Sequence, residues 1–394
     1  MAVHEPVLHL RPEKERPVLA GHPWIFAGAV RDLDPGLVPG TVVTVCRAGG
    51  DFVGRGYVNP RCTIAVRMLT RRDEPIDAHF VRRRLTTALA LRRALVPPDT
   101  DAFRLVNGEG DGLPGIVADV YGPVVVLQCL TAGAARLRDA CIDVLLETLG
   151  PAGVYERSTG SVRREEGLSA DEGVVVGSVP DEPILVREGG HRFRVDVRAG
   201  QKTGFFLDQR DNRRLAASLA RGRTVLNAFA YTGAFSVYAG AGGARSVVSV
   251  ESAARAVAAA RDHWALNGPP AAEAEWITAD VFRYLRTTER VFDLLILDPP
   301  ALVKRRHDVA AGARAYKDLH LGALRRASPD ALMLTFSCSQ HVSRELFRKI
   351  VAGAAADAGR EVRVLRHLGP GPDHPVAIAH LEGDYLAGLL LKVN

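Results

Sequence analysis

The sequence of 394 residues lacks the marks of several protein classes. It contains no run of 18 uncharged apolar residues, so we expect no transmembrane helix and no membrane partner. Its five cysteines are widely spaced and include no Cys-x-x-Cys pair, which argues against a disulfide framework and against a zinc site. The first residues carry charges of both signs around no apolar core, so a secretory signal is not expected. We predict a protein of the reducing cytoplasm that binds no metal.

What the chain does contain is an excess of basic residues. Lys and Arg number 51 against 45 Asp and Glu, a net charge of +6, which favours a polyanionic partner such as a nucleic acid. The composition, 47% hydrophobic and 24% charged, is typical of a globular protein. At this length two or three domains are expected. The sequence leaves the oligomeric state open, a homodimer included.

The first 190 residues predict two small domains. In residues 1–70, strand-like runs at Thr41–Cys46, Phe52–Val58 and Thr63–Leu69 are separated by Gly and Pro, which indicates a small β-barrel or sandwich. In residues 71–190, a basic helical stretch precedes a pattern of strand, turn, strand, helix and strand, with the helix near Ala132–Leu149. We interpret this second part as an α+β domain.

The pattern changes after residue 200, and residues 191–394 predict a doubly wound α/β domain. Short, almost wholly apolar strands alternate with helices, as expected when helices cover both faces of a parallel sheet. The runs that show this alternation are Val225–Ala228, Phe235–Ala239, Ser246–Glu251, Ala253–Asn267, Trp276–Thr278, Phe292–Leu297, Leu332–Phe336 and Arg344–Ala358.

Polar residues follow the strands of this domain where an open α/β sheet binds its ligands. Gly233 permits a tight turn after the first strand, but that loop is not Gly-x-Gly-x-x-Gly, and the chain has no Gly-x-x-x-x-Gly-Lys-Ser/Thr. Glu251 ends the second strand, where it can bind ribose hydroxyls or cap the next helix. Asp280 can contact an adenine amino group, and Asp298-Pro299-Pro300 follows the fourth strand. The order fits S-adenosylmethionine better than NAD.

The candidate cofactor-binding residues extend beyond these carboxylates. The segment Gly200–Arg213 is too polar for a core element; it is either a helix entry with Asp208 or Asp211 in the first turn, or, as we prefer, a segment that faces the cofactor or substrate. The full set of candidates for S-adenosylmethionine is Asn227, Phe229, Tyr231, Gly233, Glu251, Asp280, Asp298, Pro299 and Gln209.

Cys338 is the candidate nucleophile because it follows an apolar strand on the side of the sheet where Asp298 lies. A thiolate there can add to C6 of a pyrimidine, which makes C5 nucleophilic enough to take a methyl group. Ala301 follows the two prolines where exocyclic-amine methyltransferases have a stacking aromatic residue, so carbon methylation is favoured. Asp298 can orient the base or accept a proton; Glu382 and His374 are the other candidate proton acceptors, each equally consistent with a structural role.

Several motifs together resemble the RlmI-type family of large-subunit rRNA 5-methylcytosine methyltransferases. They are Gln201-Lys-Thr-Gly204, Leu207-Asp-Gln-Arg210, Phe229-Ala-Tyr-Thr-Gly233, Asp298-Pro-Pro300, Tyr316-Lys-Asp318, Thr335-Phe-Ser-Cys-Ser339 and Asp373-His-Pro375. The resemblance implies a Rossmann-like class I methyltransferase sheet with an added antiparallel strand, and a PUA-like RNA-binding domain around His22-Pro-Trp-Ile-Phe26. It also implies Cys338 as nucleophile, and related 5-methyluridine enzymes lend support to Glu382 as base.

The expected partner is large-subunit rRNA, single-stranded or with the target nucleotide flipped out. We predict Trp24, Arg82, Arg157 and Lys202 as RNA-binding residues, although Arg82 and its basic neighbours, through Arg92 and Arg93, are equally consistent with a solvated helix face. Two alternatives stay open. One is methylation of uridine C5 or of a guanine nitrogen, with Cys338 structural; the other is a non-catalytic RNA-binding or ribosome-assembly factor.

Overall fold

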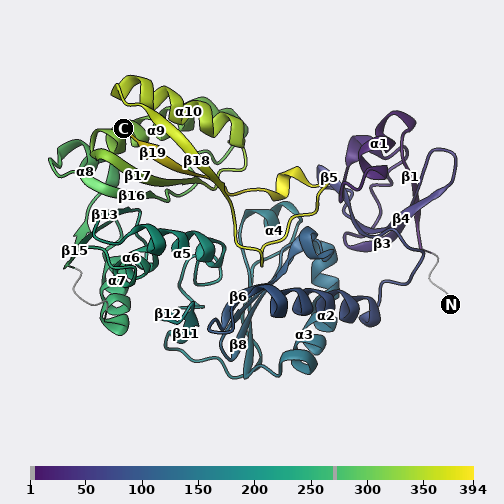
Figure 1. Ribbon diagram of the computed structural model, residues 1–394. Coiled ribbons are helices and arrows are strands. Elements are labelled where there is room, and N and C mark those ends of the chain that lie inside the picture. The colour runs from purple at the N-terminus through teal and green to yellow at the C-terminus, as the bar shows by residue number, and fades with distance from the viewer. Residues whose placement is uncertain (1–4, 269–272) are drawn as a thin grey trace. The chain divides into compact units, whose positions relative to one another are not determined.

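The computed structural model describes residues 5–268 and 273–394 and consists of two compact units (Figure 1). Unit 1 contains Met1–Val186, Val195–Leu207 and Pro372–Gly383. Unit 2 contains Arg187–Arg194, Asp208–Gly371 and Asp384–Asn394. Two segments from the second half of the chain, 195–207 and 372–383, therefore belong to the N-terminal unit. No helix of the described residues is long and apolar enough to cross a bilayer.

The first sheet of unit 1 has five strands around an apolar core. In spatial order they are β1 (Val7–His9), β3 (Thr41–Cys46), β4 (Phe52–Val58), β5 (Ile64–Thr70) and β2 (Trp24–Phe26). All neighbouring pairs are antiparallel except β1 and β3. The short helix α1 (Glu15–Leu19) lies between β1 and β2 in the chain. The three predicted strands are confirmed, with the third shifted by one residue.

The second sheet of unit 1 carries two long helices. Its strands, in spatial order, are β10 (Asp171–Gly177), β9 (Gly153–Ser158), β8 (Val124–Cys129), β7 (Ile116–Tyr121) and β6 (Ala102–Asn107). The helices α2 (Ala78–Leu95) and α3 (Ala132–Leu149) pack on it, and α4 (Ser161–Glu165) precedes β10. The predicted α+β architecture is confirmed. The pattern predicted three strands, whereas the sheet has five; β10 was missed because this edge strand begins with exposed polar residues.

A shared core holds the two sheets of unit 1 together. Tyr57 of β4 is buried, and its hydroxyl donates to the carbonyl of Pro114 at 2.7 Å and lies 2.7 Å from Thr131 Oγ1. A Cβ on Gly133 would lie 2.0 Å from the Tyr57 ring, so only glycine permits this approach of α3 to the ring. Unit 1 thus includes both of the parts that the sequence analysis divides at residue 70.

Unit 2 is built on a seven-stranded sheet. Its spatial order is β15 (Glu273–Thr278), β14 (Ser246–Glu251), β13 (Thr224–Ala228), β16 (Phe292–Leu297), β17 (Ala327–Ser337), β19 (Ala387–Val393) and β18 (Val362–Leu368). The strands from β15 to β17 are parallel, whereas β19 is antiparallel to both neighbours. The expected Rossmann-like sheet with an added antiparallel strand is confirmed.

Helices cover both faces of this sheet (Figure 1). One face packs against α5 (Arg210–Leu219), α6 (Ala234–Ala241) and α7 (Ala254–Asn267). The other packs against α8 (Val281–Thr287), α9 (Val309–Arg325) and α10 (Arg344–Ala358). Adjacent residues Val225 and Leu226 of β13 enter opposite cores, as the alternation of side chains along a strand requires.

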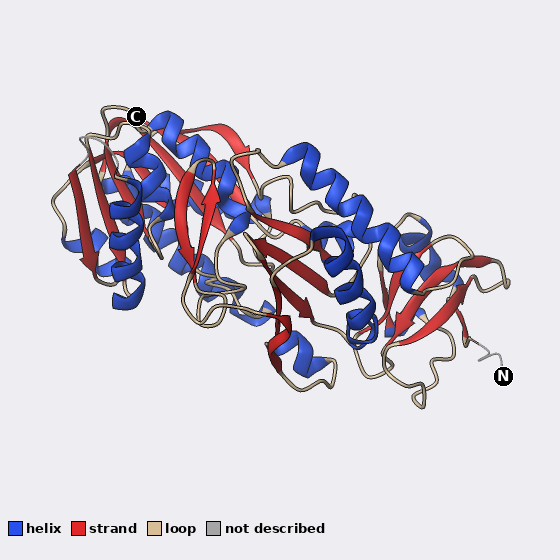
Figure 2. Cartoon of the chain, turned by 90° about the horizontal axis from the view of Figure 1, so that it is seen from below, coloured by secondary structure: helices blue, strands red, loops and turns tan. Residues whose placement is uncertain are grey.

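Shorter elements complete the chain, and Figure 2 shows how helices, strands and loops are distributed along it. The strands β11 (Ile184–Glu188) and β12 (His191–Val195) form a two-stranded sheet. Short 3-10 turns occur at η1 (Pro12–Lys14), η2 (Ala27–Ala29), η3 (Gly108–Asp111), η4 (Leu207–Gln209), η5 (Arg306–Asp308) and η6 (Leu381–Gly383).

Replacing glycine by alanine should have opposite effects on stability at two helical glycines, Gly133 and Gly353. Gly133→Ala forces the Tyr57 ring to move and should cost about 1–3 kcal/mol of stability. In α10, a Cβ on Gly353 meets nothing nearer than 3.5 Å, so Gly353→Ala should add roughly 0.5–1 kcal/mol through its better helix propensity. Thermal unfolding should show Tm lowered by the first change and raised by the second. An unchanged Tm for Gly133→Ala would contradict the close approach.

Candidate active site

The carboxyl ends of four parallel strands meet at one edge of the unit 2 sheet. β13 lies between β14 and β16, so the strand order reverses there, which is where open α/β sheets bind ligands. Ala228, the last residue of β13, pairs with Val250 of β14 and with Leu297 of β16. The residues at the ends of these three strands, and those that follow them directly, therefore lie side by side. They include Glu251 and Asp298.

The loop after β13 has an unusual backbone that brings its peptide groups toward this edge. Phe229, Tyr231 and Gly233 have positive φ angles of 60°, 45° and 75°. A Cβ on Gly233 would lie 2.7 Å from the Cβ of Ala260 in α7, so the loop packs too closely there for any side chain. Two left-handed non-glycine residues in one short loop store strain, which is common where a backbone is shaped to hold a ligand.

Glu251 fixes the shape of this loop. Its Oε2 accepts a hydrogen bond from the Tyr231 backbone N–H at 3.0 Å, and its Oε1 accepts from the Ala253 N–H at 3.0 Å. Glu251 thus binds the chain just before α7, although α7 has no side-chain N-cap, so the capping role that the sequence left open is not present. Asp280 lies at the start of α8, where its Oδ1 accepts from the Arg283 N–H at 2.8 Å. Both carboxylates are held at the sheet edge by these hydrogen bonds, although only Asp280 caps a helix.

His263 supports the same loop from α7. Its Nε2 accepts from the Arg194 N–H at 2.9 Å, so its Nδ1 carries the proton and donates to the Thr232 carbonyl at 2.8 Å. Burial lowers the pKa of His263, which keeps this neutral form. The sequence analysis did not identify His263 as part of the site, because its two partners lie 31 and 69 residues away.

Buried polar atoms beside the loop fit the cofactor that the sequence predicts. The Asn227 amide donates to Ser236 Oγ at 2.8 Å, whereas the buried Asn227 Oδ1 and Thr232 Oγ1 have no hydrogen-bond partner within the described chain. Leaving such a buried atom unpaired costs about 1–3 kcal/mol, so a bound polar group would relieve the cost. With the carboxylates of Glu251 and Asp280 available for hydroxyl and amino donors, the residues present fit S-adenosylmethionine.

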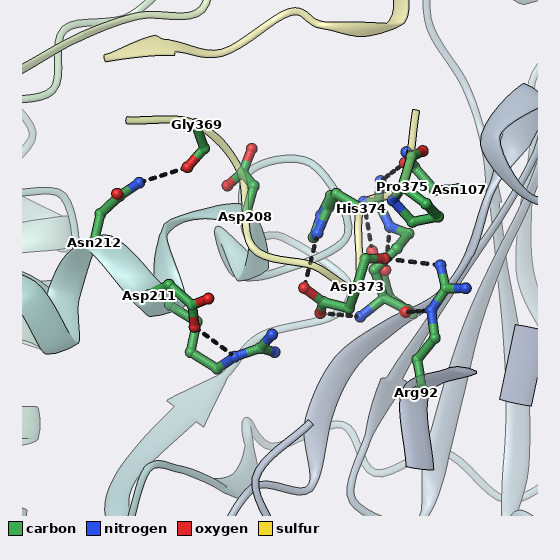
Figure 3. A network of polar contacts seen from close by, with 12 residues as sticks. Arg92, Asn107, Asp208, Asp211, Asn212, Gly369, Asp373, His374 and Pro375 are labelled. Atoms are coloured by element: carbon green, nitrogen blue, oxygen red, sulfur yellow. Dashed lines mark hydrogen bonds and ion pairs between the residues drawn. The ribbon is translucent and has the colours of Figure 1, made fainter. Parts of the chain in front are cut away.

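Gln209 is more strongly engaged with the protein than the sequence suggested. It lies in η4 and is buried, and its Oε1 accepts from Asn212 Nδ2 at 2.7 Å. Asn212 also donates to the Gly369 carbonyl at 3.0 Å (Figure 3). Asp208 accepts from the Tyr385 hydroxyl at 2.5 Å. This segment is thus a buried helix entry, with Asp211 in the first turn of α5; a contact of Gln209 with the cofactor stays a prediction.

Cys338 lies next to the Asp-Pro-Pro loop. Its Sγ is 3.8 Å from the carbonyl oxygen of Pro299, and the residue is partly exposed. Three other cysteines are fully buried, and burial raises the pKa of all four remaining thiols, to about 11 for Cys62 and about 12 for Cys141. The structure therefore brings Cys338, Pro299 and the adjacent Asp298 together at the sheet edge, as the sequence predicts.

A buried tyrosine holds the strand end that carries Cys338. The Tyr316 hydroxyl of α9 accepts from Ser337 Oγ at 2.9 Å and lies 3.0 Å from Ser339 Oγ. Ser339 Oγ in turn accepts from the Val303 N–H at 3.2 Å. The two neighbours of Cys338 are thereby tied to α9 and to the loop after Asp298. Tyr316 stands in one of the resemblance motifs, but no pattern in the sequence indicated this role.

The other two candidate proton acceptors lie in unit 1. Glu382 pairs with His22 at 3.1 Å. Desolvation raises the pKa of Glu382, but the hydrogen bonds from its own N–H and from His22 outweigh this effect, so its pKa is lowered. His374 is buried, with Nδ1 3.1 Å from Asp373 Oδ1 (Figure 3). The Asp373 carbonyl accepts from Arg92, and the Pro375 carbonyl accepts from Asn107 at 3.0 Å. These contacts anchor the segment 372–383 within unit 1.

The predicted RNA-binding residues are largely engaged with protein groups. Trp24 donates from Nε1 to Glu109 at 2.7 Å, Arg82 pairs with Glu147, and Arg157 lies 3.5 Å from Glu172. Exposed Lys202 lies over the Phe206 ring at 4.6 Å. The prediction of a phosphate-contacting helix face is wrong for one residue. Arg92 does not lie on a phosphate-facing surface, because it is buried in an ion pair with Asp111.

His320 makes the stability of unit 2 depend on pH. The Tyr316 carbonyl can only accept, so His320 Nδ1 donates to it at 2.6 Å and Nε2 accepts from Thr335 Oγ1 at 2.8 Å. Burial lowers the pKa of His320 from 6.5 to about 4. The unfolded chain therefore binds a proton more readily than the folded chain between these two values. Stability that is fully present above pH 6.5 is lost as the pH falls toward 4.

The expected loss from His320 is about 3 kcal/mol over this range. Denaturant unfolding at a series of pH values should show it, and His320→Gln, which does not titrate, should flatten the profile. The matched control is His307→Gln, since His307 is exposed; this variant should keep the wild-type slope. Equal slopes for His320→Gln and wild type would contradict the buried neutral form.

Comparisons with known proteins agree with this geometry. A family model described as an S-adenosylmethionine-dependent methyltransferase matches residues 148–322, and one described as a PUA-like domain matches residues 8–71. The chain is 42% identical over 390 residues to the ribosomal RNA large subunit methyltransferase I of Alteromonas mediterranea, and 39% identical over 392 residues to that of Shewanella denitrificans. These alignments cover 98% of this chain and 98–99% of the relatives.

A solved structure shares the fold over nearly the whole chain. A putative SAM-dependent methyltransferase from Streptococcus mutans superimposes with a TM-score of 0.84 at 24% identity, covering 98% of this chain and 100% of that one. The N-terminal PUA-like fold and the methyltransferase sheet are thus both established, and the cofactor is S-adenosylmethionine. The chain belongs to the family of S-adenosylmethionine-dependent methyltransferases that includes its relatives named ribosomal RNA large subunit methyltransferase I.

Proposed function

We propose that the protein methylates C5 of a cytidine in large-subunit rRNA through a covalent bond between Cys338 and C6. The observation that carries the proposal is the position of the Cys338 thiol, partly exposed and 3.8 Å from the Pro299 carbonyl at the ligand-binding edge of the sheet. The names of the relatives, which refer to large-subunit ribosomal RNA, supply the substrate class. The basic net charge of the chain is consistent with it.

The chemistry requires a thiolate that adds to C6, because C5 of cytosine is by itself a poor nucleophile. Bound S-adenosylmethionine supplies the methyl group on its sulfonium. The Cys338 thiolate forms a bond to C6, which moves electron density to C5 and lets C5 take the methyl group. A base then removes the C5 proton, the C5–C6 double bond re-forms, and the thiolate leaves. The Tyr316, Ser337 and Ser339 hydrogen bonds hold the thiol in place through both bond changes.

Asp298 is the proton acceptor that we favour. It adjoins Pro299, whose carbonyl contacts the thiol, so it belongs to the same loop as the nucleophile's neighbour. Glu382 is a weaker base because its pKa is lowered beside His22, and His374 is buried against Asp373. The nearby Ala301 cannot stack on a base, which favours attack at a ring carbon over transfer to an exocyclic amine.

Replacing Cys338 tests the covalent mechanism. Cys338→Ala should lower methyl transfer to cytidine by about 10³-fold or more, because the activating bond cannot form. Cys62→Ala is the matched control, since Cys62 is the other partly exposed free cysteine and should leave the rate unchanged. The measurement is mass mapping of rRNA after incubation with labelled cofactor. A methyl group on uridine C5, or on a guanine nitrogen in the Cys338→Ala variant, would overturn the assignment.

An analogue substrate gives an independent readout. RNA that contains 5-fluorocytidine has no C5 proton to lose, so the Cys338–C6 bond should persist after methyl transfer. A denaturing gel should then show a protein–RNA adduct for wild type and for Cys62→Ala, and none for Cys338→Ala. A chain that binds RNA without catalysis, as an assembly factor would, should form no adduct in any variant.

Cofactor binding is tested at Glu251. Glu251→Gln replaces a carboxylate by a neutral amide where two ribose hydroxyls are expected, so the Kd for S-adenosylmethionine should rise about 10- to 100-fold. Calorimetry measures this without any RNA present. Glu273→Gln, at the exposed start of β15, removes the same charge from the same sheet and should not change the Kd. Equal Kd values for the two variants would contradict a role of Glu251 in binding the cofactor.

A further inference from the structure

A cationic segment directly follows the loop that contacts the Cys338 thiol. Lys304, Arg305 and Arg306 are consecutive and exposed, and they lie between Asp298-Pro299-Pro300 and the start of α9. We refer to these three residues as the cationic segment. None of the predicted RNA-binding residues lies in it.

The residue that precedes the cationic segment, Val303, is firmly held. Val303 is 2% exposed, and its N–H donates to Ser339 Oγ, the neighbour of Cys338, at 3.2 Å. Gly312 of α9 packs against the same place, since a Cβ there would lie 2.2 Å from Val303 Cγ2. Three residues of extended chain span at most about 11 Å. The three cations are therefore confined to the surroundings of the catalytic thiol.

The charges of the cationic segment are not balanced by the protein. Within the described residues, no carboxylate forms an ion pair with Lys304, Arg305 or Arg306, and the neighbouring Asp308 pairs instead with His307 at 3.4 Å. Several cations of unit 2, among them Arg283, Arg314 and Arg348, are likewise exposed without an ion pair among the described residues, whereas other exposed cations of unit 2 are paired. The pairs are Arg286–Asp318, Arg290–Glu275, Lys317–Asp357, Lys349–Glu345 and Arg363–Glu361. What distinguishes the cationic segment is that its three unpaired cations are consecutive and follow Val303, which bonds to the neighbour of Cys338, so an anion from outside the chain can bind there.

We propose that the cationic segment binds the phosphates of the RNA strand that flank the target nucleotide. The inference rests on the proposed function, because it names the RNA contact of the same site. A flipped-out nucleotide stays connected to its two phosphates, so these must lie close to the base that Cys338 attacks. Lys and Arg contacts to phosphates set the position of a strand without reading its sequence. The cationic segment thus holds the strand, while the pocket selects the base.

The test is direct RNA binding by a triple variant, K304A/R305A/R306A. Because each phosphate contact on a single strand contributes about 0.7 to the slope of log affinity against log salt, the slope should become shallower by about 2. The Kd for a fluorescein-labelled single-stranded RNA at low salt should rise at least about tenfold. In turnover experiments the rise should appear in KM, with kcat nearly unchanged once RNA is saturating.

The matched control removes the same number of charges elsewhere on unit 2. R286A/K349A/R363A replaces three exposed cations that already pair with carboxylates, so its slope should stay close to that of wild type. Calorimetry with S-adenosylmethionine and thermal unfolding check that both variants remain folded. Equal salt slopes for the two triple variants would overturn the proposal and leave the cationic segment as a solvated surface.

The readout separates this proposal from the proposed function. Binding is measured in the absence of methyl transfer, so the salt slope decides the role of the cationic segment even if wild-type protein methylates another atom. Conversely, loss of the cytidine product in Cys338→Ala tests the chemistry even if the salt slope does not change. If wild type shows no salt-dependent RNA binding at all, the cationic segment does not bind RNA.

Discussion

The parallel register of β13, β16 and β17 is the constraint on which the candidate site depends. Leu297 pairs with Ala228 on one side and with Thr335 on the other, so the segments that leave these strands start at the same height. Asp298 follows Leu297 at once, and Cys338 follows Thr335 by three residues. A shift of one residue in either pairing would turn the side chains to opposite faces and separate the thiol from the Pro299 carbonyl.

Buried hydrogen bonds then hold the end of β17, next to Cys338, in the position that the strand register gives it. Tyr316, Ser337, Ser339, His320 and Thr335 are all buried, and each has a partner within the group. Such a network is costly if one member is lost, because the remaining polar groups stay buried without partners. The benefit is a single position for the strand end. For the reaction that we propose, in which the thiol bonds to C6 and later leaves, a fixed starting geometry lowers the entropic cost of each step.

Much of the architecture was predictable because local patterns determine it. The helix over 132–149, the strands at 41–46 and 52–58, and the alternating elements after residue 200 follow from periodicity and turn residues alone. The site edge was predictable for the same reason: in a doubly wound sheet the residues after successive strands converge. Cys338 and Asp298 could be expected together on this basis, and the structure has the Cys338 thiol 3.8 Å from the carbonyl of Pro299, the neighbour of Asp298. The roles of the two residues stay predictions.

Partners that lie far apart in the sequence could not be predicted. Arg92 looked like a surface cation of a basic helix, but it is buried by contacts with Asp111 and with the Asp373 carbonyl, 281 residues away. Glu382 was a candidate proton acceptor, but it contacts His22 across 360 residues. In both cases the local sequence gives the charge of a side chain and says nothing of the group that neutralises it. Contacts of this range depend on the completed fold.

The same distinction decides which charges can hold RNA. The net charge of +6 pointed to a polyanion, yet a cation that already pairs with a carboxylate releases few counterions when a phosphate approaches, and it must first break its own pair. Arg82 and Arg157 carry this cost through Glu147 and Glu172. The cationic segment of residues 304–306 does not carry this cost. Val303, the residue before it, donates a hydrogen bond to Ser339, the neighbour of Cys338. The affinity for RNA should therefore depend on where the unpaired cations lie more than on how many basic residues the chain contains.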